Sequence, residues 1–318
     1  MKHFVNFENL ETDEINKIIE NAIIIKNNPK RFSDALEGKF LYELFQKTST
    51  RTALSFSIGM EELGGKYFFQ KWEDSNFNVG EIRDEVRYIG SNVDMVMARL
   101  KFNKDINEMA YYSPIPVING CCNKYHPCQV MADLLTVKEL FGTYNIKMLY
   151  VGVLNNVLNS LTESLPRLGG ELFVLTPIVN IASFDQEIID YAEETGNLHL
   201  LNHVEYTGEK LLDLVNDMDI IYTDSWVDME FFNNSEFTEF KSERIEKMMP
   251  FQLNSKLLSG SRAKIMHDMP IHAGYEISRE MIEKNIGVIL QQAANRKHVQ
   301  KAIMLYLLNG ETLNLRSK

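Results

Sequence analysis

The stretch Phe45-Gln46-Lys47-Thr48-Ser49-Thr50-Arg51-Thr52 lies where one sequence pattern ends and another begins. Before it, residues 39–45 form a short apolar run typical of a buried strand. After it, apolar residues recur at helical spacing from Ala53 to the pair Gly64-Gly65, which predicts a helix that ends at the glycines. The four polar residues at the end of the stretch therefore fall at a strand-to-helix junction.

These four residues combine three hydroxyl groups and one guanidinium with the start of a helix. The first backbone N–H groups of a helix have no partner within it, and the helix dipole favours an anion there. Such N–H groups, hydroxyls and an arginine fork are donors well suited to phosphate oxygens. The pattern indicates a phosphate cradle made of Ser49, Thr50, Arg51 and Thr52. Taken alone, the same residues also fit a capping Ser or Thr beside a solvated Arg.

A second polar group stands at the start of a later helix. In His126-Pro127-Cys128-Gln129 the proline suits the first helical position, and apolar residues follow at helical spacing. The His and the Gln are three residues apart, so both side chains can reach one space. A His can donate to a polarised carbonyl, and a Gln amide can accept from an NH2 group. Taken alone, this segment also fits a capped core helix with a satisfied histidine.

With these two motifs in place, the chain resembles the aspartate/ornithine carbamoyltransferase family over nearly its whole length, and the ornithine branch more closely. Ser-Thr-Arg-Thr after a strand and His-Pro-x-Gln before a helix are that family's two carbamoyl phosphate motifs. Further similar stretches occur in the family's order: Leu63-Gly64-Gly65, Met97-Ala98-Arg99, Pro116-Val117-Ile118-Asn119-Gly120, Tyr222-Thr223-Asp224-Ser225-Trp226 and Gln292-Ala293-Ala294-Asn295-Arg296. Several independent motifs in the same order indicate membership of this family.

The resemblance implies that a neutral primary amine attacks the carbonyl carbon of carbamoyl phosphate and releases phosphate. Carbamoyl phosphate would be bound by Ser49, Thr50, Arg51, Thr52, Arg99, His126, Gln129 and Arg296. The catalytic residues would be Arg99, His126, Asp268 and Arg296. Arg99 would bridge the phosphate and the carbonyl oxygen, His126 would donate to the same oxygen, and Gln129 would orient the carbamoyl nitrogen. Without the resemblance, a surface ion pair is the simpler interpretation of either arginine. No metal or organic cofactor is needed, because the leaving phosphate already activates the substrate.

The amine substrate would be bound by Asn155, Asn156, Asp224, Asp228, Met229, Asp268 and Met269. Here the sequence departs from the ornithine pattern. The family's Asp-x-Trp-x-Ser-Met-Gly reads 224–230 with Asp228 for Ser and Glu230 for Gly, and its His-Cys-Leu-Pro reads 267–270 with Asp268 for Cys. The family's Gly-Asp-Gly-Asn-Asn turn keeps only its first Gly and the two Asn, at 152–156.

These departures bear on the acceptor. A carboxylate at position 228 would repel a substrate's α-carboxylate, at a cost of about 1 to 4 kcal/mol. Asp268 could accept a proton or hold an ammonium group. L-ornithine is the default acceptor, and putrescine or another diamine is the alternative. Asp228 and Glu230 could instead turn outward to water. The other function classes are a relative that binds carbamoyl phosphate without turnover and an aspartate carbamoyltransferase, which the acidic loops disfavour. The direction of the reaction stays open.

The strand and helix patterns alternate along both halves of the chain. Residues 40–45, 93–98 and 117–119 are expected strands in the first half, with helices over 12–26 and 81–90. In the second half, the expected strands are 147–153, 172–176, 219–223 and 263–267. The pattern predicts an α/β fold of two domains, each with a mostly parallel β-sheet flanked by helices. We expect domains at 1–140 and 141–290, with a C-terminal helix near 291–318 that packs back on the first, as the family architecture implies.

Composition narrows the function classes. A chain of 318 residues with 45% hydrophobic content can bury two cores. The net charge of −11 argues against nucleic-acid binding, and no stretch is apolar enough to span a membrane. Three clustered cysteines (Cys121, Cys122, Cys128) and the lack of a signal peptide indicate a cytoplasmic protein with reduced thiols. The thiols lack the spacing of a zinc site.

The family also implies an assembly. Its members form homotrimers, in which a loop from the neighbouring subunit completes each site. In this chain that loop corresponds to residues 72–77, and we expect Trp72 and Phe77 to be buried against a partner subunit. No residue of this loop can be assigned to the neighbour's site from the sequence.

Overall fold

The computed structural model describes residues 1–227, 229–232 and 235–310, and these divide into two compact units. Unit 1 is Met1–Leu135 together with the stretch that begins at Ala294, and unit 2 is Thr136–Ala293. Two helices, α5 (Pro127–Phe141) and α11 (Arg279–Asn309), contain residues of both units. Within the described residues, no helix is long and apolar enough to cross a membrane.

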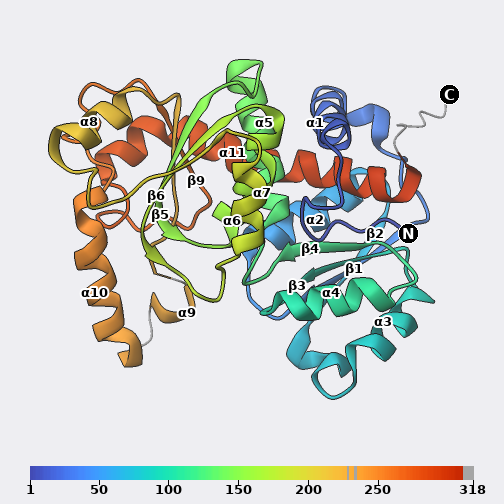
Figure 1. Cartoon of the computed structure of the whole chain (residues 1–318). Coiled ribbons are helices and arrows are strands. Elements are labelled where there is room, and N and C mark those ends of the chain that lie inside the picture. Colours follow the sequence, from blue (N-terminus) through green and yellow to red (C-terminus); the bar gives the residue numbers. More distant parts are fainter. Residues whose placement is uncertain (228, 233–234, 311–318) are drawn as a thin grey trace. The chain divides into compact units, whose positions relative to one another are not determined.

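Unit 1 is built on a sheet of four parallel strands in the order β2-β1-β3-β4. The strands are β1 (Phe40–Phe45), β2 (Lys66–Lys71), β3 (Met95–Arg99) and β4 (Val117–Cys121). The helices of this unit are α1 (Thr12–Asn27), α2 (Thr50–Glu62), α3 (Ile82–Gly90) and α4 (Asn103–Tyr112). Figure 1 shows α3 and α4 on one face of this sheet and α1 and α2 on the other. The central strands are buried, as helices on both faces require.

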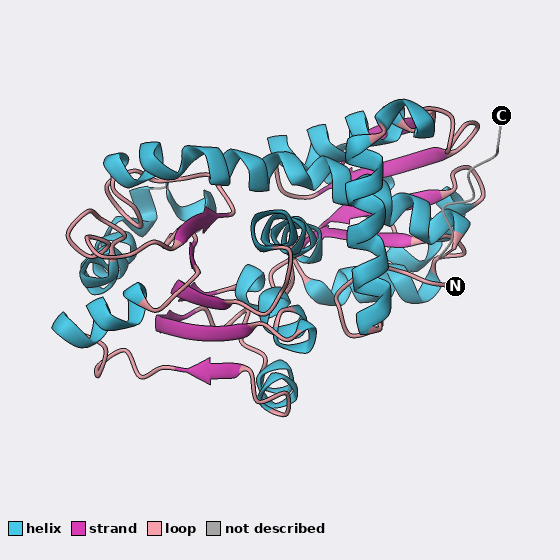
Figure 2. Cartoon of the chain, turned by 90° about the horizontal axis from the view of Figure 1, so that it is seen from above, coloured by secondary structure: helices cyan, strands magenta, loops and turns pink. Residues whose placement is uncertain are grey.

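Unit 2 is built on five parallel strands in the order β7-β6-β5-β8-β9. The strands are β5 (Lys147–Leu154), β6 (Glu171–Val179), β7 (Leu198–Leu200), β8 (Ile220–Thr223) and β9 (Lys264–His267). The helices are α6 (Asn156–Ser164), α7 (Gln186–Glu193), α8 (Gly208–Asn216), α9 (Met229–Phe232) and α10 (Thr238–Met248). Figure 2 shows the strands of this sheet running beside one another.

The two faces of the unit 2 sheet are covered by different helices. On one face, α8 and the start of α11 pack on Leu149, Ile221 and Ile265 in one apolar core. Leu158 of α6 and Ile188 of α7 line a small apolar cavity on the opposite side of β6, beside Val174. Because each strand runs parallel to its neighbours, all the strand carboxyl ends meet at one edge of the sheet. Ligands of open α/β sheets bind at that edge.

The predicted elements are confirmed with shifts of a few residues at their ends, and the predicted fold of two parallel-sheet α/β domains is confirmed. Two strands were not predicted: β2 exposes most of its side chains and lacks alternation, and β7 has only three residues. The last predicted helix is part of a longer one, because α11 begins at Arg279. Gly287 interrupts the helical pattern in its first half.

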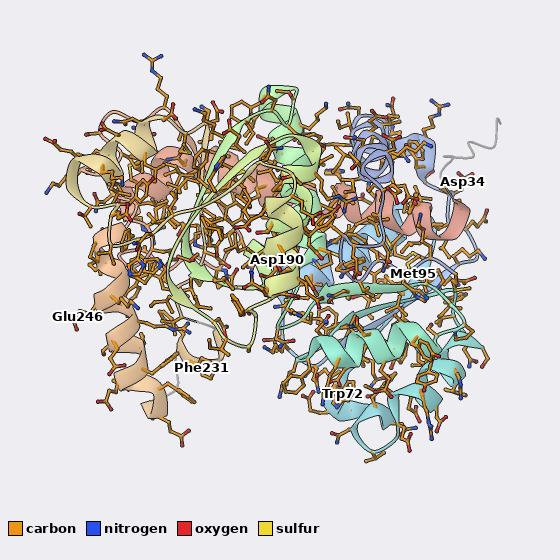
Figure 3. The ribbon with its side chains drawn as sticks, viewed as in Figure 1. Asp34, Trp72, Met95, Asp190, Phe231 and Glu246 are labelled. Atoms are coloured by element: carbon orange, nitrogen blue, oxygen red, sulfur yellow. The ribbon has the colours of Figure 1, made fainter. Side chains whose placement is uncertain are left out.

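The expectation for the loop after β2 is wrong in one respect. Phe77 is 3% exposed, so it is already buried within its own chain and needs no partner subunit for burial. Its ring lies 5.3 Å from that of Trp72, which is half-buried in the same loop (Figure 3). The two side chains therefore form a local aromatic pair that closes this loop on itself.

Candidate active site

In unit 1, the predicted site residues begin at the start of α2, directly after β1. Ser49 is the N-cap of α2: its Oγ accepts a hydrogen bond from the Thr52 backbone N–H at 3.2 Å, as the sequence predicts for this junction. The Ser49 hydroxyl also lies 3.0 Å from Thr52 Oγ1. Thr50 and Arg51 are the first two residues of the helix, so their N–H groups point out of its N-terminus. The four residues form one anion-binding end.

Arg296 reaches this end from α11. Its Nη2 donates to Thr52 Oγ1 at 2.9 Å, and both side chains are buried, with Arg296 1% exposed. An arginine buried at a helix N-terminus, where the dipole is already positive, raises the local positive potential further. Such an end of a helix is suited to an anion with more than one charge.

Two more predicted residues lie at the carboxyl ends of β3 and β4. Arg99 is the last residue of β3, and a β-bulge between Ala98 and Arg99 shifts its pairing with β4. His126 follows β4 and directly precedes α5. Its imidazole is 3% exposed, and burial lowers its pKa well below the ordinary value, with Arg296, Arg99 and Arg51 adding to that shift. His126 is therefore a neutral imidazole at pH 7, among three arginines.

Gln129 supplies an acceptor beside these donors. Its Nε2 donates to Asp133 Oδ1 at 2.9 Å, which fixes the orientation of the amide within α5. Its Oε1 is buried and accepts no hydrogen bond from the described residues. A buried amide oxygen without a donor is costly, so this atom is suited to a ligand N–H group. Asp133 was not among the predicted residues, although it lies one helical turn after Gln129.

Unit 1 contains all eight residues predicted for carbamoyl phosphate, and contacts link Ser49 to Thr52 and Thr52 to Arg296, while His126 lies near Arg51, Arg99 and Arg296. Their side chains offer cationic, hydroxyl and backbone N–H donors for a phosphate, and one oxygen acceptor for an amide nitrogen. The three cysteines nearby are buried thiols that form no disulfide among the described residues. Cys128 Sγ donates to the Asn119 carbonyl oxygen at 3.3 Å, and burial raises the pKa of this thiol to about 12. The thiol is therefore an inert packing group at neutral pH.

A separate group of predicted residues lies at the carboxyl edge of the unit 2 sheet. Asn155 follows β5 and caps α6: its Oδ1 accepts from the Val157 and Leu158 backbone N–H groups at 3.0 and 3.1 Å. Its Nδ2 donates to Asp224 Oδ2 at 2.6 Å. The Asn155 side chain therefore links the start of one helix to the end of β8. Asn156 is the first residue of α6 and is half-buried.

Asp224 and Asp268 form a carboxyl pair at this edge. Asp224 follows β8 and is 9% exposed, and Asp268 follows β9. Burial, followed by the charge of Asp268, raises the pKa of Asp224 to about 7. Asp268 Oδ1 is buried and accepts no hydrogen bond from the described residues. The pair can hold a proton or a cation in this position.

A buried histidine holds the turn that carries Asp268, and sequence reasoning missed it. His267 Nδ1 accepts from the Met269 backbone N–H at 2.7 Å, so the ring proton sits on Nε2, 3.1 Å from Glu276 Oε1. Met269 adopts a left-handed conformation with φ 64°, which is uncommon for a residue other than glycine. The hydrogen bond from its N–H supports this turn. A histidine at the end of a buried strand, with a Glu nine residues on, was the signal in the sequence.

The remaining predicted residues of the amine site lie in a loop that the structure describes only in part. Asp228 lies outside the described residues. Met229 is the first residue of α9, and its side chain is outside the description. Before this loop, Trp226 is 2% exposed and packs with Val153 and Met248.

Comparisons with known proteins identify the family. Residues 2–139 match the family model "Aspartate/ornithine carbamoyltransferase, carbamoyl-P binding domain", and residues 144–307 match "Aspartate/ornithine carbamoyltransferase, Asp/Orn binding domain". The ornithine carbamoyltransferase of Haloquadratum walsbyi is 35% identical over 96% of this chain and 98% of its own length. The structure of the Pyrococcus furiosus ornithine carbamoyltransferase is similar with a TM-score of 0.86, 34% identity and 97% coverage of both chains. That of the anabolic Campylobacter jejuni enzyme has a TM-score of 0.85 and 33% identity, and covers 97% of this chain and 99% of its own. The chain belongs to the aspartate/ornithine carbamoyltransferase family and is a transferase.

Proposed function

We propose that the protein transfers the carbamoyl group of carbamoyl phosphate to a primary amine of an ornithine-like substrate and releases phosphate. One observation carries this proposal: Arg51, Arg99 and Arg296 surround the buried, neutral His126 beside the N-terminus of α2. This set of donors matches the charge that develops when carbamoyl phosphate is attacked. Negative charge then grows on the carbonyl oxygen and on the leaving phosphate.

Each residue of the unit 1 site has a separate role in this proposal. Ser49, Thr50, Arg51 and Thr52 hold the phosphate, and Arg99 bridges the phosphate and the carbonyl oxygen. The neutral His126 donates to that oxygen, which a cationic arginine also stabilises. Fixed donors of this kind contribute about 3 kcal/mol each to the transition state.

Gln129 and Arg296 of α11 complete the proposed contacts to carbamoyl phosphate. Gln129 Oε1 accepts from the carbamoyl NH2 group, because Asp133 already holds the other end of its amide. Arg296 adds a cation from α11 at the same helix end as Thr52. The orientation of carbamoyl phosphate is then fixed at the phosphate, the carbonyl oxygen and the nitrogen.

On the unit 2 side, we assign the acceptor to Asn155, Asn156, Asp224, Asp268 and Met269, with Asp228 and Met229 from the loop before α9. L-ornithine is the default acceptor. The Asp224–Asp268 pair supports a diamine such as putrescine as the second candidate, because two adjacent carboxylates favour an ammonium group over a carboxylate. An aspartate substrate would bring further carboxylates to a site that is already acidic.

We also propose a cytoplasmic homotrimer. The reduced, buried thiols support the compartment. The edge strand β2 supports self-association: Tyr67, Phe68 and Phe69 are 38%, 56% and 43% exposed. A sheet edge with exposed aromatic side chains is a surface that a further subunit would cover.

The test is a coupled assay of phosphate release and ureido product with carbamoyl phosphate and a panel of amines. The panel is L-ornithine, putrescine, agmatine, L-lysine, acetylornithine and L-aspartate. We expect turnover with L-ornithine or a diamine, and a loss of about 100-fold or more in Arg99→Gln. The exposed Arg262→Gln is the control with the same change in charge. Absence of ureido product across the panel contradicts the proposal.

A further inference from the structure

One buried carboxyl in unit 1 has no part in the contacts proposed for carbamoyl phosphate. Glu43 lies in the middle of β1, between Tyr42 and Leu44, and is fully buried. A carboxyl is rarely buried to this extent unless it is paired with a cation or a metal. The neighbouring strands place Phe69 of β2 and Met97 of β3 beside it, and neither is charged. These surroundings favour the neutral form of Glu43.

A hydrogen bond from α2 reaches this carboxyl. Ser57 Oγ donates to Glu43 Oε1 at 2.9 Å. The other oxygen, Oε2, is buried and has no hydrogen-bond partner among the residues that the structure describes. Burial raises the pKa of Glu43 to about 8, against the opposing effect of the Ser57 hydrogen bond. Most of this carboxyl is therefore protonated at pH 7, with Oε1 as the acceptor and the proton on Oε2.

The Glu43–Ser57 hydrogen bond closes the segment that carries the phosphate cradle. The two residues are 14 positions apart, and between them the chain leaves β1, turns and begins α2. The cradle, residues 49–52, lies inside this closed segment, at the junction of the strand and the helix. The position of α2 on β1 decides where the backbone N–H groups of its first turn point. A contact between strand and helix therefore helps to fix the shape of the cradle.

Ionisation of Glu43 would disturb this contact. A buried carboxylate oxygen without a donor is costly, because it has lost the water that solvates it in the unfolded chain. Oε2 would gain hydrogen bonds if water entered between β1 and α2, which would move the helix off the strand. The donors of the cradle depend on the start of that helix, so they would lose their alignment.

We propose that Glu43 is a positioning residue for the phosphate cradle: its neutral carboxyl holds α2 on β1 through Ser57, and its ionised form releases the helix. This role rests on the proposed carbamoyl transfer, in which the cradle binds the phosphate group. Phosphate and the Glu43 proton then favour the same arrangement of strand and helix, so each strengthens the binding of the other. The affinity for phosphate falls as the pH rises through the titration of Glu43.

The experiment measures the dissociation constant (Kd) of inorganic phosphate by calorimetry at pH 7 and pH 9.5, in wild type and in Glu43→Gln. The glutamine keeps an oxygen acceptor for Ser57 and cannot ionise. We expect the two proteins to have the same Kd at pH 7. At pH 9.5 the wild-type Kd should be about 5- to 30-fold higher than that of the variant. The ionisation of phosphate itself cancels in this ratio.

A second readout counts protons. At pH 8.5 we expect phosphate binding to take up about 0.3 to 0.8 more protons in wild type than in Glu43→Gln. Binding enthalpies in buffers of different ionisation enthalpy give this number. Glu61→Gln removes a charge from an exposed position of the same helix, α2, and should behave as wild type in both measurements. A role of Glu43 in stability alone would change neither.

Ser57→Ala separates positioning from charge repulsion between Glu43 and the bound anion. The variant removes the contact from α2 and adds no charge, so we expect the Kd at pH 7 to rise about 2- to 5-fold. Repulsion alone predicts no change. Ser242→Ala, at an exposed position in α10, is the matched control and should leave the Kd unchanged. Thermal unfolding of each variant at each pH separates loss of folding from loss of binding.

The outcomes separate the two proposals. Equal Kd values and equal proton uptake in wild type and Glu43→Gln overturn the role of Glu43, and so does an unchanged Kd in Ser57→Ala. Carbamoyl transfer stands in either case. Wild type that binds no phosphate at pH 7 overturns the cradle, the proposed function and this role together.

Discussion

Arg296 Nη2 donates a 2.9 Å hydrogen bond to Thr52 Oγ1, although the two residues are 244 positions apart in the chain. The same oxygen lies 3.0 Å from the Ser49 hydroxyl that caps α2. One hydroxyl therefore joins the proposed phosphate-binding end of α2 to the last helix of the described chain. The anion site of unit 1 depends on residues from both ends of the sequence.

Thr52→Val removes this junction and keeps the shape of the side chain. Because a hydrogen bond to a charged donor contributes about 1.5 to 3 kcal/mol, we expect the KM for carbamoyl phosphate to rise about 10- to 100-fold. The KM is measured from initial rates at varied carbamoyl phosphate and saturating amine. Thr207→Val, an exposed threonine before α8, is the matched control. An unchanged KM would mean that Arg296 is positioned without Thr52.

His126→Gln tests the neutral donor. The variant keeps an N–H donor but not the position of the ring nitrogen, and we expect kcat to fall about 10²- to 10³-fold, as for other lost oxyanion donors. Burial and three arginines hold the pKa of His126 well below its usual range. Titration of His126 should therefore not appear in the dependence of wild-type kcat on pH between 6 and 7. The pH profiles of wild type and His126→Gln should have the same shape in this range. An ionisation that the variant lacks would mean that a protonated His126 takes part.

Glu43→Gln should stabilise the protein at high pH. The Glu43 carboxyl lies within β1, accepts a hydrogen bond from Ser57 Oγ at 2.9 Å, and has a pKa raised by burial to about 8. The folded protein thus binds the proton more tightly than the unfolded chain, whose carboxyl titrates near 4.5. Stability from this group is complete below pH 4.5 and is lost as the pH rises toward 8.

We expect the glutamine variant to match wild type at pH 4.5 and to be more stable by about 2 to 4 kcal/mol at pH 8. Urea unfolding at the two pH values measures the difference. Exposed Glu61→Gln is the control and should change little at either pH. A larger gain at pH 4.5 than at pH 8 would contradict the assignment.

Glu62→Gln should weaken the contact between α2 and α11. Glu62 accepts from Lys297 Nζ at 2.5 Å and from Lys301 Nζ at 2.7 Å, and the Lys301 side chain is 2% exposed. Without the carboxylate, a buried ammonium loses its counter-charge, at a cost of about 1 to 3 kcal/mol. Chemical unfolding at pH 7 measures this loss. Lys301→Met in the same background should recover part of it, and a further loss would contradict the buried-charge account.

The sequence predicted those parts of the site that depend on local order. Ser49 is a cap at a strand-to-helix junction, as the sequence indicated, because a cap is decided by a few adjacent residues. The cap at Asn155 was not predicted. The order of buried runs and helical patterns predicted the parallel sheets. The edge strand β2 was missed because its exposed aromatic side chains do not alternate with polar ones.

The sequence could not predict contacts that only the folded chain brings together. The Asn155–Asp224 bond joins residues 69 positions apart, and no periodicity relates them. The same holds for the Glu43–Ser57 contact between β1 and α2, where a carboxyl in a buried strand contradicts the expected apolar pattern. His267 and Glu276 lie nine positions apart with no periodicity between them, and only the fold brings their side chains together.

Asn155 connects the Asp224–Asp268 pair to two backbone amides at the start of α6, so hydrogen exchange at these amides can report ligand binding at the pair. Its Oδ1 holds the Val157 and Leu158 amides, while its Nδ2 holds Asp224. A cation bound between Asp224 and Asp268 would compete with Asn155 for the Asp224 carboxylate. Asn155 is also the side chain that caps the first turn of α6. If the acceptor binds here as proposed, we expect deuterium uptake at these two amides to change on binding, even in a variant that no longer turns over.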